Sequence, residues 1–296
     1  MNGVNILPTT LSPLRYPGGK TQLNSFVEHT LEINHLDNVV YCEPFSGGSG
    51  IAISLLLNKK AQSVILNDID IAIYSFWYAI IHDSEHFIKA IQDVTIDMTE
   101  WKKQRLIYEA AQANNLQEYS FEVAFATFYL NRTNRSGIIT GGPIGGNNQE
   151  SSYTLDCRFK KNILIKKIRK IAEVGNLIRL YHLDAKELIR NVLTHENAHE
   201  LFVYFDPPYY KQGKNLYKNF YDDNEHMLLS KAIRMMDGYH WIATYDNAKR
   251  IKEIYNDRTI QEYQIQYSAN KTRKEIELIF HSPLTRIESY GKVKLK

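Results

Sequence analysis

Short apolar runs alternate along this chain with stretches that mix apolar and polar positions in the manner of helices. The runs are rich in β-branched and aromatic residues, which is typical of strands. We therefore predict strands at residues 39–43, 63–67, 176–183, 201–205, 240–245 and 276–281. Strands that alternate with helices in this way favour an α/β sheet.

The alternation stops between residues 76 and 160. Helix-like patterns at residues 101–113 and 119–131 precede a polar, Gly-rich stretch at residues 136–148. A loop of that length in a compact domain is usually functional or mobile. We interpret residues 76–160 as a mainly helical domain inserted between the second and third strands of the sheet. The domain that contains the sheet is then made of residues 1–75 and 161–296.

A carboxylate and two prolines follow the apolar run at residues 201–205, in the order Asp206-Pro207-Pro208-Tyr209. Proline has no N–H to donate and holds the preceding residue extended, so the pair ends the strand and turns the two preceding carbonyls outward. When a carboxylate and a carbonyl each accept a hydrogen bond from one N–H of an exocyclic amine, they pull its nitrogen toward tetrahedral geometry and free the lone pair. Tyr209 would stack on the ring. The alternative is a turn in which the aspartate accepts local backbone bonds.

A Gly-rich turn at residues 43–50 follows the first predicted strand and opens an apolar helix. Glycines there let the backbone approach a ligand at a helix N-terminus. Asp68 ends the next strand, 18 residues beyond Gly50. In nucleotide-binding folds an acidic residue about 20 residues on binds the ribose hydroxyls, which favours Asp68 for that role. Asp70 is the competitor, but we expect it to cap the helix that begins at Ile71.

Composition narrows the class of protein. No apolar stretch approaches the roughly 18 residues of a membrane helix, and the start has no signal-peptide pattern, so we expect a cytoplasmic protein with no membrane partner. The two cysteines, Cys42 and Cys157, indicate neither a disulfide framework nor a Cys-based metal site. The net charge is only +3, but residues 158–170 carry seven basic side chains and no acidic one. Such a run suits either a solvated helix face or a phosphate-contacting surface.

Two further motifs match known signatures incompletely. Residues 15–21 end like a phosphate-binding P-loop, but Leu14 occupies the position of its first glycine and no strand precedes it. His195-Glu196-Asn197-Ala198-His199 matches the H-E-x-x-H zinc signature. The strand predicted at residues 201–205 begins too soon afterwards for a metal-binding helix, so we expect no metal and place these histidines in a surface turn.

The Gly-rich turn, the acid for ribose and the later acidic motif together indicate a group-transfer site on an α/β sheet. The chain resembles the Dam-like class of adenine-specific DNA methyltransferases in four ordered motifs, at residues 15–20, 43–50, 66–68 and 206–209. The likeness covers nearly the whole chain. It extends to residues 131–133, 216–217, 220 and 241–246.

The resemblance implies a Rossmann-like methyltransferase sheet that uses S-adenosyl-L-methionine as cofactor, with the insertion as target recognition domain. The positions implied to bind or line the cofactor are Tyr16, Lys20, Phe45, Gly47, Gly48, Asp68 and Asp206. Asp184 is matched to a contact with the cofactor's adenine, although an aspartate before Ala185 is also a good helix N-cap. The catalytic residues implied are Asp206, Pro207 and Tyr209.

The implied reaction moves the sulfonium methyl group to the exocyclic amine of adenine in double-stranded DNA. The base must flip out of the duplex, at a cost on the order of a few kcal/mol that stacking on Tyr209 offsets. Asp206 supports the positive charge that develops on the amine, so an ordinary aspartate pKa of about 3.9 suits the task. The side chains expected to contact DNA are Asn131, Arg132, Arg135, Lys160 and Lys161.

Several alternatives stay open. Asn131 and Arg132 could equally cap and brace the helix before them, and beyond Arg132 the chain departs from relatives that read GATC, which leaves the target sequence open. Related Asp/Asn-Pro-Pro-Tyr sites methylate cytosine amines, RNA bases or glutamine amides, although motif order and the insertion favour adenine in DNA. A DNA-binding protein without activity and a zinc peptidase are the other classes considered. A cognate restriction endonuclease is a candidate partner, in a bacterial or phage host.

Overall fold

The computed structural model describes residues 10–15, 20–211, 221–267 and 273–296, and its centre is a seven-stranded sheet with the order β3-β2-β1-β4-β5-β7-β6. The strands are β1 (Val40–Glu43), β2 (Ser63–Asn67), β3 (Ile178–Tyr181), β4 (Leu201–Phe205), β5 (His240–Asp246), β6 (Gln261–Tyr267) and β7 (Arg273–His281). The pairs from β3 to β5 are parallel, whereas β7 runs antiparallel to β5 and β6.

All six predicted strands are present, which confirms the α/β class with a Rossmann-like sheet. β3 is shorter than predicted because Gly175–Leu177 forms a 3-10 turn before it. The pattern missed β6, an edge strand in which glutamine and glutamate alternate with larger side chains. An edge strand has a partner on one side only, so its sequence needs fewer apolar positions.

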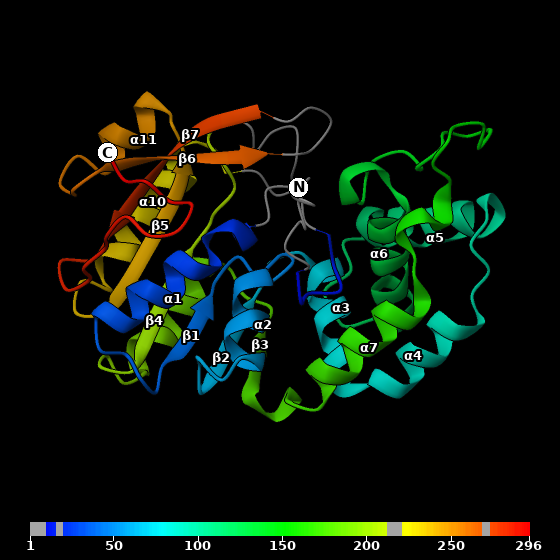
Figure 1. Cartoon of the computed structure of the whole chain (residues 1–296), viewed down its shortest axis with the longest axis horizontal. Coiled ribbons are helices and arrows are strands. Elements are labelled where there is room, and N and C mark those ends of the chain that lie inside the picture. Colours follow the sequence, from blue (N-terminus) through cyan, green and yellow to red (C-terminus); the bar gives the residue numbers. More distant parts are fainter. Residues whose placement is uncertain (1–9, 16–19, 212–220, 268–272) are drawn as a thin grey trace, which may run out of the picture.

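Helices cover both faces of the sheet and also form a second lobe beside it (Figure 1). They are α1 (Asn24–Ile33), α2 (Gly50–Leu57), α3 (Ile71–His82), α4 (Ser84–Asp93), α5 (Met98–Ala113), α6 (Phe121–Thr133), α7 (Lys161–Ala172), α8 (Ala185–Asn191), α10 (Asp223–Arg234) and α11 (Lys249–Ile254). Within the described ranges, no helix combines the length and the apolar character needed to cross a membrane.

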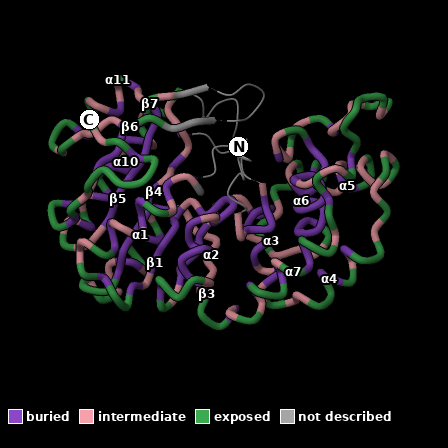
Figure 2. Tube along the Cα trace, in the orientation of Figure 1, coloured by how far each residue is buried: buried purple, intermediate pink, exposed green. Residues whose placement is uncertain are grey.

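Successive residues of the central strands face opposite sides of the sheet, and each side has its own core. Tyr41 and Phe202 pack with residues of α1, α2 and α3, whereas Cys42 and Val203 pack with residues of α8, α10 and α11. β4 is buried over its whole length because it lies in the middle of the sheet. Figure 2 shows buried residues running through the strands and exposed residues at the turns around them.

The chain between β2 and β3 is helical and makes up the second lobe, on the right of Figure 1. The helices predicted at residues 101–113 and 119–131 correspond to α5 and α6, whereas the division of the chain into two domains stays a prediction. Phe76 of α3 stacks on Phe128 of α6 with ring centroids 5.9 Å apart, and both belong to the core that contains Tyr41. The lobe therefore shares its core with one face of the sheet.

The strand order reverses next to β1, which lies between β2 and β4. In open α/β sheets, ligands bind outside the carboxyl ends of the strands at such a reversal. Glu43 ends β1 and opens the Gly-rich turn, while Asp206 comes directly after β4. The fold thus brings the two predicted halves of the site to neighbouring strand ends.

Candidate active site

Asp206 is held at the carboxyl end of β4 by a threonine of the neighbouring strand. The Thr244 hydroxyl of β5 donates to Asp206 Oδ1 at 2.8 Å, and the carboxylate side chain is 25% exposed. Burial raises the pKa of Asp206 to about 6, although the nearby ammonium of Lys20 acts in the opposite direction. Our expectation of an ordinary aspartate pKa was wrong, because sequence gives no measure of desolvation.

Lys20 and Tyr209, both predicted site residues, lie beside Asp206. The Lys20 ammonium is 3.8 Å from Asp206 Oδ1 and 4.8 Å from the centre of the Tyr209 ring. A buried glutamate of β7, Glu277, accepts hydrogen bonds from both Lys20 and the Tyr209 hydroxyl. The sequence motifs gave no signal for Glu277, because it is paired with Lys20 across 257 residues of chain.

A second carboxylate fixes the chain that follows Tyr209. Asp246, at the end of β5, accepts the backbone N–H groups of Tyr210 and Lys211 at 2.9 Å each. The Lys211 ammonium donates to the Asn247 carbonyl at 2.7 Å. The turn after the two prolines is therefore tied to β5, which keeps Tyr209 at the carboxyl edge of the sheet.

The Gly-rich turn after β1 meets Asp68, as the sequence predicted for a nucleotide site. Gly47 has φ +43° and donates its N–H to Asp68 Oδ2 at 2.8 Å, while the Asp70 N–H donates to Oδ1 at 3.0 Å. Burial, and then the charge of Asp70, raise the pKa of Asp68 to about 7. Asp70 itself accepts from the Ala72 N–H at 2.9 Å, which confirms that it caps α3.

Buried side chains hold this turn from beneath. The Trp77 indole donates to the Gly47 carbonyl at 2.9 Å. The Asn67 amide, at the end of β2, donates to the Pro44 carbonyl at 2.9 Å and to the Leu183 carbonyl at 3.0 Å. Hydrogen bonds within the protein thus hold the turn, and they hold the chain after β3 beside it.

The other predicted cofactor residues lie at or near the same edge. Phe45 packs edge-on against Tyr221, with ring centroids 6.1 Å apart, and Gly48 belongs to the same turn. Asp184 accepts from the Lys186 N–H at 2.8 Å and forms an ion pair with its ammonium at 2.9 Å. Asp184 is therefore the N-cap of α8, and its contact with a cofactor stays a prediction. Tyr16 lies outside the described residues, as do residues 216, 217 and 220.

Asn131, predicted to contact DNA, is fully buried and braces the start of the chain. Its Oδ1 accepts the Arg15 N–H at 2.8 Å, and its Nδ2 donates to the carbonyls of Arg15 at 2.7 Å and Gly137 at 2.9 Å. Gly137 has φ +77°, and a Cβ there would stand 2.3 Å from the Arg15 oxygen. These contacts favour the bracing alternative, and they tie the insertion to the segment that leads to Lys20.

The other predicted DNA contacts divide into exposed and structural side chains. Arg135 is exposed and donates to the Pro143 carbonyl at 3.2 Å, and exposed Lys160 lies 4.0 Å from Asp156. The Lys161 ammonium instead donates to two carbonyls at the end of α4, those of Gln92 at 2.8 Å and Val94 at 2.6 Å. A cation at a helix C-terminus satisfies carbonyls that lack an intrahelical partner, so Lys161 stabilises the packing of α7 on α4.

Four cations gather where the start of the chain meets the insertion, and we call them the cation cluster: Arg15, Arg132, Arg158 and Lys167. Burial, and then the charges of Arg15 and Arg158, lower the pKa of Arg132 to about 10. The Arg132 guanidinium donates to the Arg158 carbonyl at 2.9 Å, and burial and Arg132 also lower the pKa of Lys167. Within the described part of the chain, no carboxylate forms an ion pair with these four residues.

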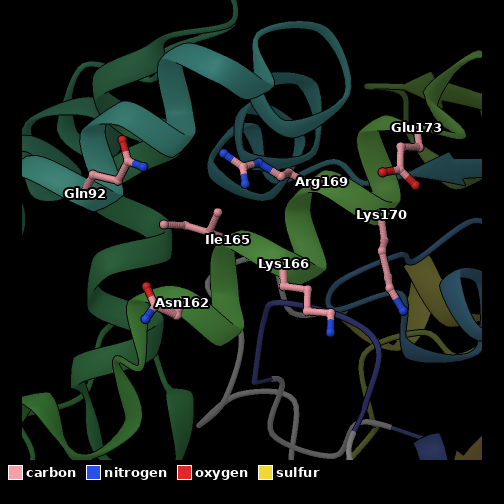
Figure 3. Close-up of a pocket in the computed structure, with 7 residues that line it drawn as sticks. All are labelled: Gln92, Asn162, Ile165, Lys166, Arg169, Lys170 and Glu173. Carbon is pink, nitrogen blue, oxygen red and sulfur yellow. The ribbon is translucent and has the colours of Figure 1, made fainter.

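The rest of the basic run borders a groove of about 490 Å³ between α4 and α7. Figure 3 shows Lys166 and Lys170, one turn apart on α7, pointing the same way, with Arg169 and Gln92 on the other side of the helix. Glu173 adds a negative charge at one end. The groove shares no lining residue with the site around Asp206.

The glutamate of the H-E-x-x-H motif forms an ion pair within the protein. Glu196 forms a two-point ion pair with Arg179 of β3, at 2.6 Å and 3.0 Å, so its carboxylate is taken up by a guanidinium. Across the described ranges, no cluster of three or more histidine, cysteine or acidic side chains is placed to hold a metal ion.

Comparison with known proteins now identifies the family. The model of the D12 class of N6 adenine-specific DNA methyltransferases matches residues 16–269. The chain belongs to this family. It is also similar to the Type II methyltransferase M.MjaIII of Methanocaldococcus jannaschii, with 24% identity over 239 residues that cover 76% of this chain and 79% of that protein. This confirms the resemblance seen in the sequence motifs, and the chain is an enzyme of the adenine-specific DNA methyltransferase class.

One solved structure, of the PH1948 protein of Pyrococcus horikoshii, aligns over 95% of this chain and 92% of its own length. The sequences are 10% identical and the TM-score is 0.40, which is too low to carry an argument. The fold class therefore rests on the strand order and on the parallel pairing described above.

Proposed function

We propose that this D12-class methyltransferase transfers a methyl group from S-adenosylmethionine to the exocyclic amine of an adenine that has flipped out of duplex DNA. One observation carries the proposal. The Asp206 carboxylate, with Lys20 and Tyr209 beside it, lies at the end of the strand next to the one that opens the Gly-rich turn and Asp68. The turn proposed to bind a nucleotide and the carboxylate proposed to bind an amine therefore lie at the same edge of the sheet.

The residues on the cofactor side fit S-adenosylmethionine. Asp68 can accept hydrogen bonds from ribose hydroxyls, and Gly47 lets the backbone come close because it adopts a left-handed φ of +43°. The Phe45 ring offers an apolar surface at the same turn. When bound, the cofactor supplies a methyl group already activated by its sulfonium, so the protein has to align the groups rather than activate them.

Asp206 would then accept a hydrogen bond from one N–H of the adenine amine, while the Pro207 carbonyl accepts a hydrogen bond from the other. The carboxylate stabilises the positive charge that develops on the nitrogen, and Thr244 keeps it in place. With a pKa of about 6, Asp206 is ionised at neutral pH. Tyr209 is the ring on which the flipped base stacks, which offsets part of the cost of leaving the duplex.

The cation cluster supports DNA as the substrate. Like charges that gather without carboxylate partners point to an external anion, and phosphates of DNA provide one. Arg15 is five residues from Lys20, so the cluster lies within about 18 Å of the site along the chain. That span corresponds to roughly five base pairs, so one duplex can reach both places. Exposed Arg135 and Lys160 are further candidates for contacts to DNA.

The name of the similar M. jannaschii protein supports a further proposal, that this enzyme works beside a cognate restriction endonuclease. Among the residues that the structure describes, no feature favours cytosine, RNA or a protein amide over adenine as the acceptor. An inactive DNA-binding protein is also disfavoured, because Asp206, Tyr209 and Asp68 are all held in place by specific hydrogen bonds.

The function is tested by mapping modified bases in DNA from cells that express the chain. We expect N6-methyladenine in one short sequence motif and none when Asp206→Ala is expressed. Once the motif is known, a duplex with 2-aminopurine at the target position should gain fluorescence on binding, since the flipped base leaves the neighbouring bases of the duplex that quench it. Modified cytosine would contradict the proposed reaction. Full adenine methylation without any gain in fluorescence would contradict base flipping.

A further inference from the structure

Glu277 lies at the centre of the antiparallel end of the sheet. It belongs to β7, where it is paired with Asp246 of β5 on one side and Tyr263 of β6 on the other. The residue is 1% exposed, although glutamate is rarely buried without partners. A carboxylate in this position needs hydrogen-bond donors or a positive charge beside it, because burial of an unpaired charge is strongly unfavourable.

Donors from three separate parts of the chain converge on this carboxylate. The Lys20 ammonium lies 2.8 Å from Oε1 and 2.7 Å from Oε2. The Tyr209 hydroxyl donates to Oε1, and the Tyr263 hydroxyl donates to Oε2. Although burial alone would raise the pKa of Glu277, Lys20 and the hydroxyls lower it, so the group is ionised. Lys20 and Tyr209, two of these donors, are residues of the methyl-transfer site.

The Lys20 ammonium therefore lies near two carboxylates, those of Glu277 and Asp206. Its ammonium is in contact with Glu277 at 2.7 Å but is 3.8 Å from Asp206 Oδ1, which is too far for a hydrogen bond. If Lys20 donated a hydrogen bond to Asp206 directly, the ammonium would occupy acceptor positions of the carboxylate, and fewer would remain for the adenine amine.

We propose that Glu277 is a positioning residue of the methyl-transfer site, which holds the Lys20 ammonium away from direct contact with Asp206 and fixes the Tyr209 ring by its hydroxyl. The inference rests on the proposed function of Asp206 and Tyr209. It assigns to β7 a part in catalysis that none of the sequence motifs indicates.

Glu277→Gln tests this role, because the amide keeps the shape and loses the charge. We expect Lys20 to move onto Asp206, and the single-turnover methylation rate to fall about 10- to 100-fold at saturating DNA and cofactor. The pH at which the rate is half-maximal should move down by about one unit, since Asp206 loses a like charge and gains a close cation. DNA affinity should change less than the rate, because the contacts to phosphate are not affected.

Two variants separate positioning from loss of stability. Tyr263→Phe removes one hydrogen bond from the same carboxylate but leaves Lys20 and Tyr209 attached, so its rate and pH profile should stay close to those of wild type. Glu277→Asp keeps the charge and shortens the reach, so its rate should fall while its pH midpoint stays in place. A purely structural role predicts that the rate loss of each variant follows the fall in its melting temperature, with no shift of the pH midpoint.

Crystal structures of wild type and Glu277→Gln give a readout that does not depend on activity. The proposal predicts that the Lys20 ammonium of the variant closes to hydrogen-bond distance from Asp206 and that the Tyr209 ring turns. Unchanged positions of both side chains would overturn it, even in a fully active enzyme. A wild-type protein that does not methylate DNA would refute the proposed function, while the crystallographic comparison would still decide the role of Glu277.

Discussion

The ionisation of Asp206 makes the pH dependence of methyl transfer a sensitive test of the site. Its pKa of about 6 is set by burial, which raises it, against Lys20 and the Thr244 hydrogen bond, which lower it. If only the ionised carboxylate supports transfer, about 90% of the sites are active at pH 7 and about 10% at pH 5. A carboxylate with the unperturbed pKa would still be more than about 90% ionised at pH 5, so the two cases differ roughly ninefold there.

Thr244→Val removes the hydroxyl that donates to Asp206 Oδ1 at 2.8 Å and keeps nearly the same shape. A hydrogen bond to a charged group contributes about 1.5 kcal/mol or more, so its loss should raise the pKa of Asp206 by about one unit. The direction follows because the bond stabilises only the ionised form. At pH 6.5 the ionised fraction should then fall from about 75% to about 25%, whereas at pH 8.5 the two proteins should react at similar rates.

The assay is single-turnover methylation of a duplex substrate between pH 5 and pH 9, with DNA and cofactor saturating. Tyr204→Phe is the matched control, because the Tyr204 hydroxyl shares a hydrogen bond with Thr244 at 2.9 Å but does not touch Asp206. We expect the control to keep the midpoint of wild type. A wild-type rate that is flat down to pH 5, or a Thr244→Val midpoint that does not rise, would refute the link between this carboxylate and the rate.

Three further predictions concern stability and DNA binding. His226 is fully buried with no hydrogen-bond partner for either ring nitrogen among the described residues, and burial lowers its pKa to about 4. The histidine of the unfolded chain binds a proton below about pH 6.5, whereas His226 in the folded protein does so only near pH 4, so a fall in pH destabilises the folded state. Between pH 8 and pH 5, the free energy of unfolding measured in urea should therefore fall by about 2 kcal/mol less for His226→Leu than for wild type. Gly137→Ala should lower the free energy of unfolding by about 2–4 kcal/mol, because its Cβ would stand 2.3 Å from a backbone oxygen. Gly146 has nearly the same φ, +76°, but lies in open space, so Gly146→Ala should lower the free energy of unfolding by only about 1 kcal/mol. Equal losses would contradict the steric argument. Arg158→Met should weaken DNA binding and reduce the slope of log K against log salt concentration by about 1. Lys161→Met should leave that slope unchanged and lower the melting temperature, because Lys161 binds carbonyls of the protein. The reverse pattern would contradict the assignment of these two residues.

The parts of the fold and site that sequence could predict depend on local patterns. Strands in the middle of a sheet need apolar residues in unbroken runs, so β1, β2 and β4 were found nearly to the residue. Asp68 and Asp206 could be predicted because each follows such a run, and the carboxyl ends of parallel strands meet at one edge. Asp70 could be recognised as a cap because it precedes an apolar helix.

The remaining features depend on contacts between distant parts of the chain. Glu277 and Asp246 act through the register of antiparallel and parallel strands, which no single stretch of sequence specifies. The basic run predicted one surface, yet Lys161 binds carbonyls of α4 and Lys167 binds backbone at the start of the chain. The raised pKa of Asp206 likewise comes from burial by surrounding elements rather than from its own motif.

The central claim is that the Asp206 carboxylate supports methyl transfer to the amine of adenine. The most direct test incubates purified protein with unmethylated DNA and S-adenosylmethionine, digests the DNA and measures methylated nucleosides by mass spectrometry. We predict N6-methyldeoxyadenosine with wild type and none with Asp206→Ala, with the cofactor saturating for both proteins. The same product from Asp206→Ala, or methylated cytosine from wild type, would contradict the account.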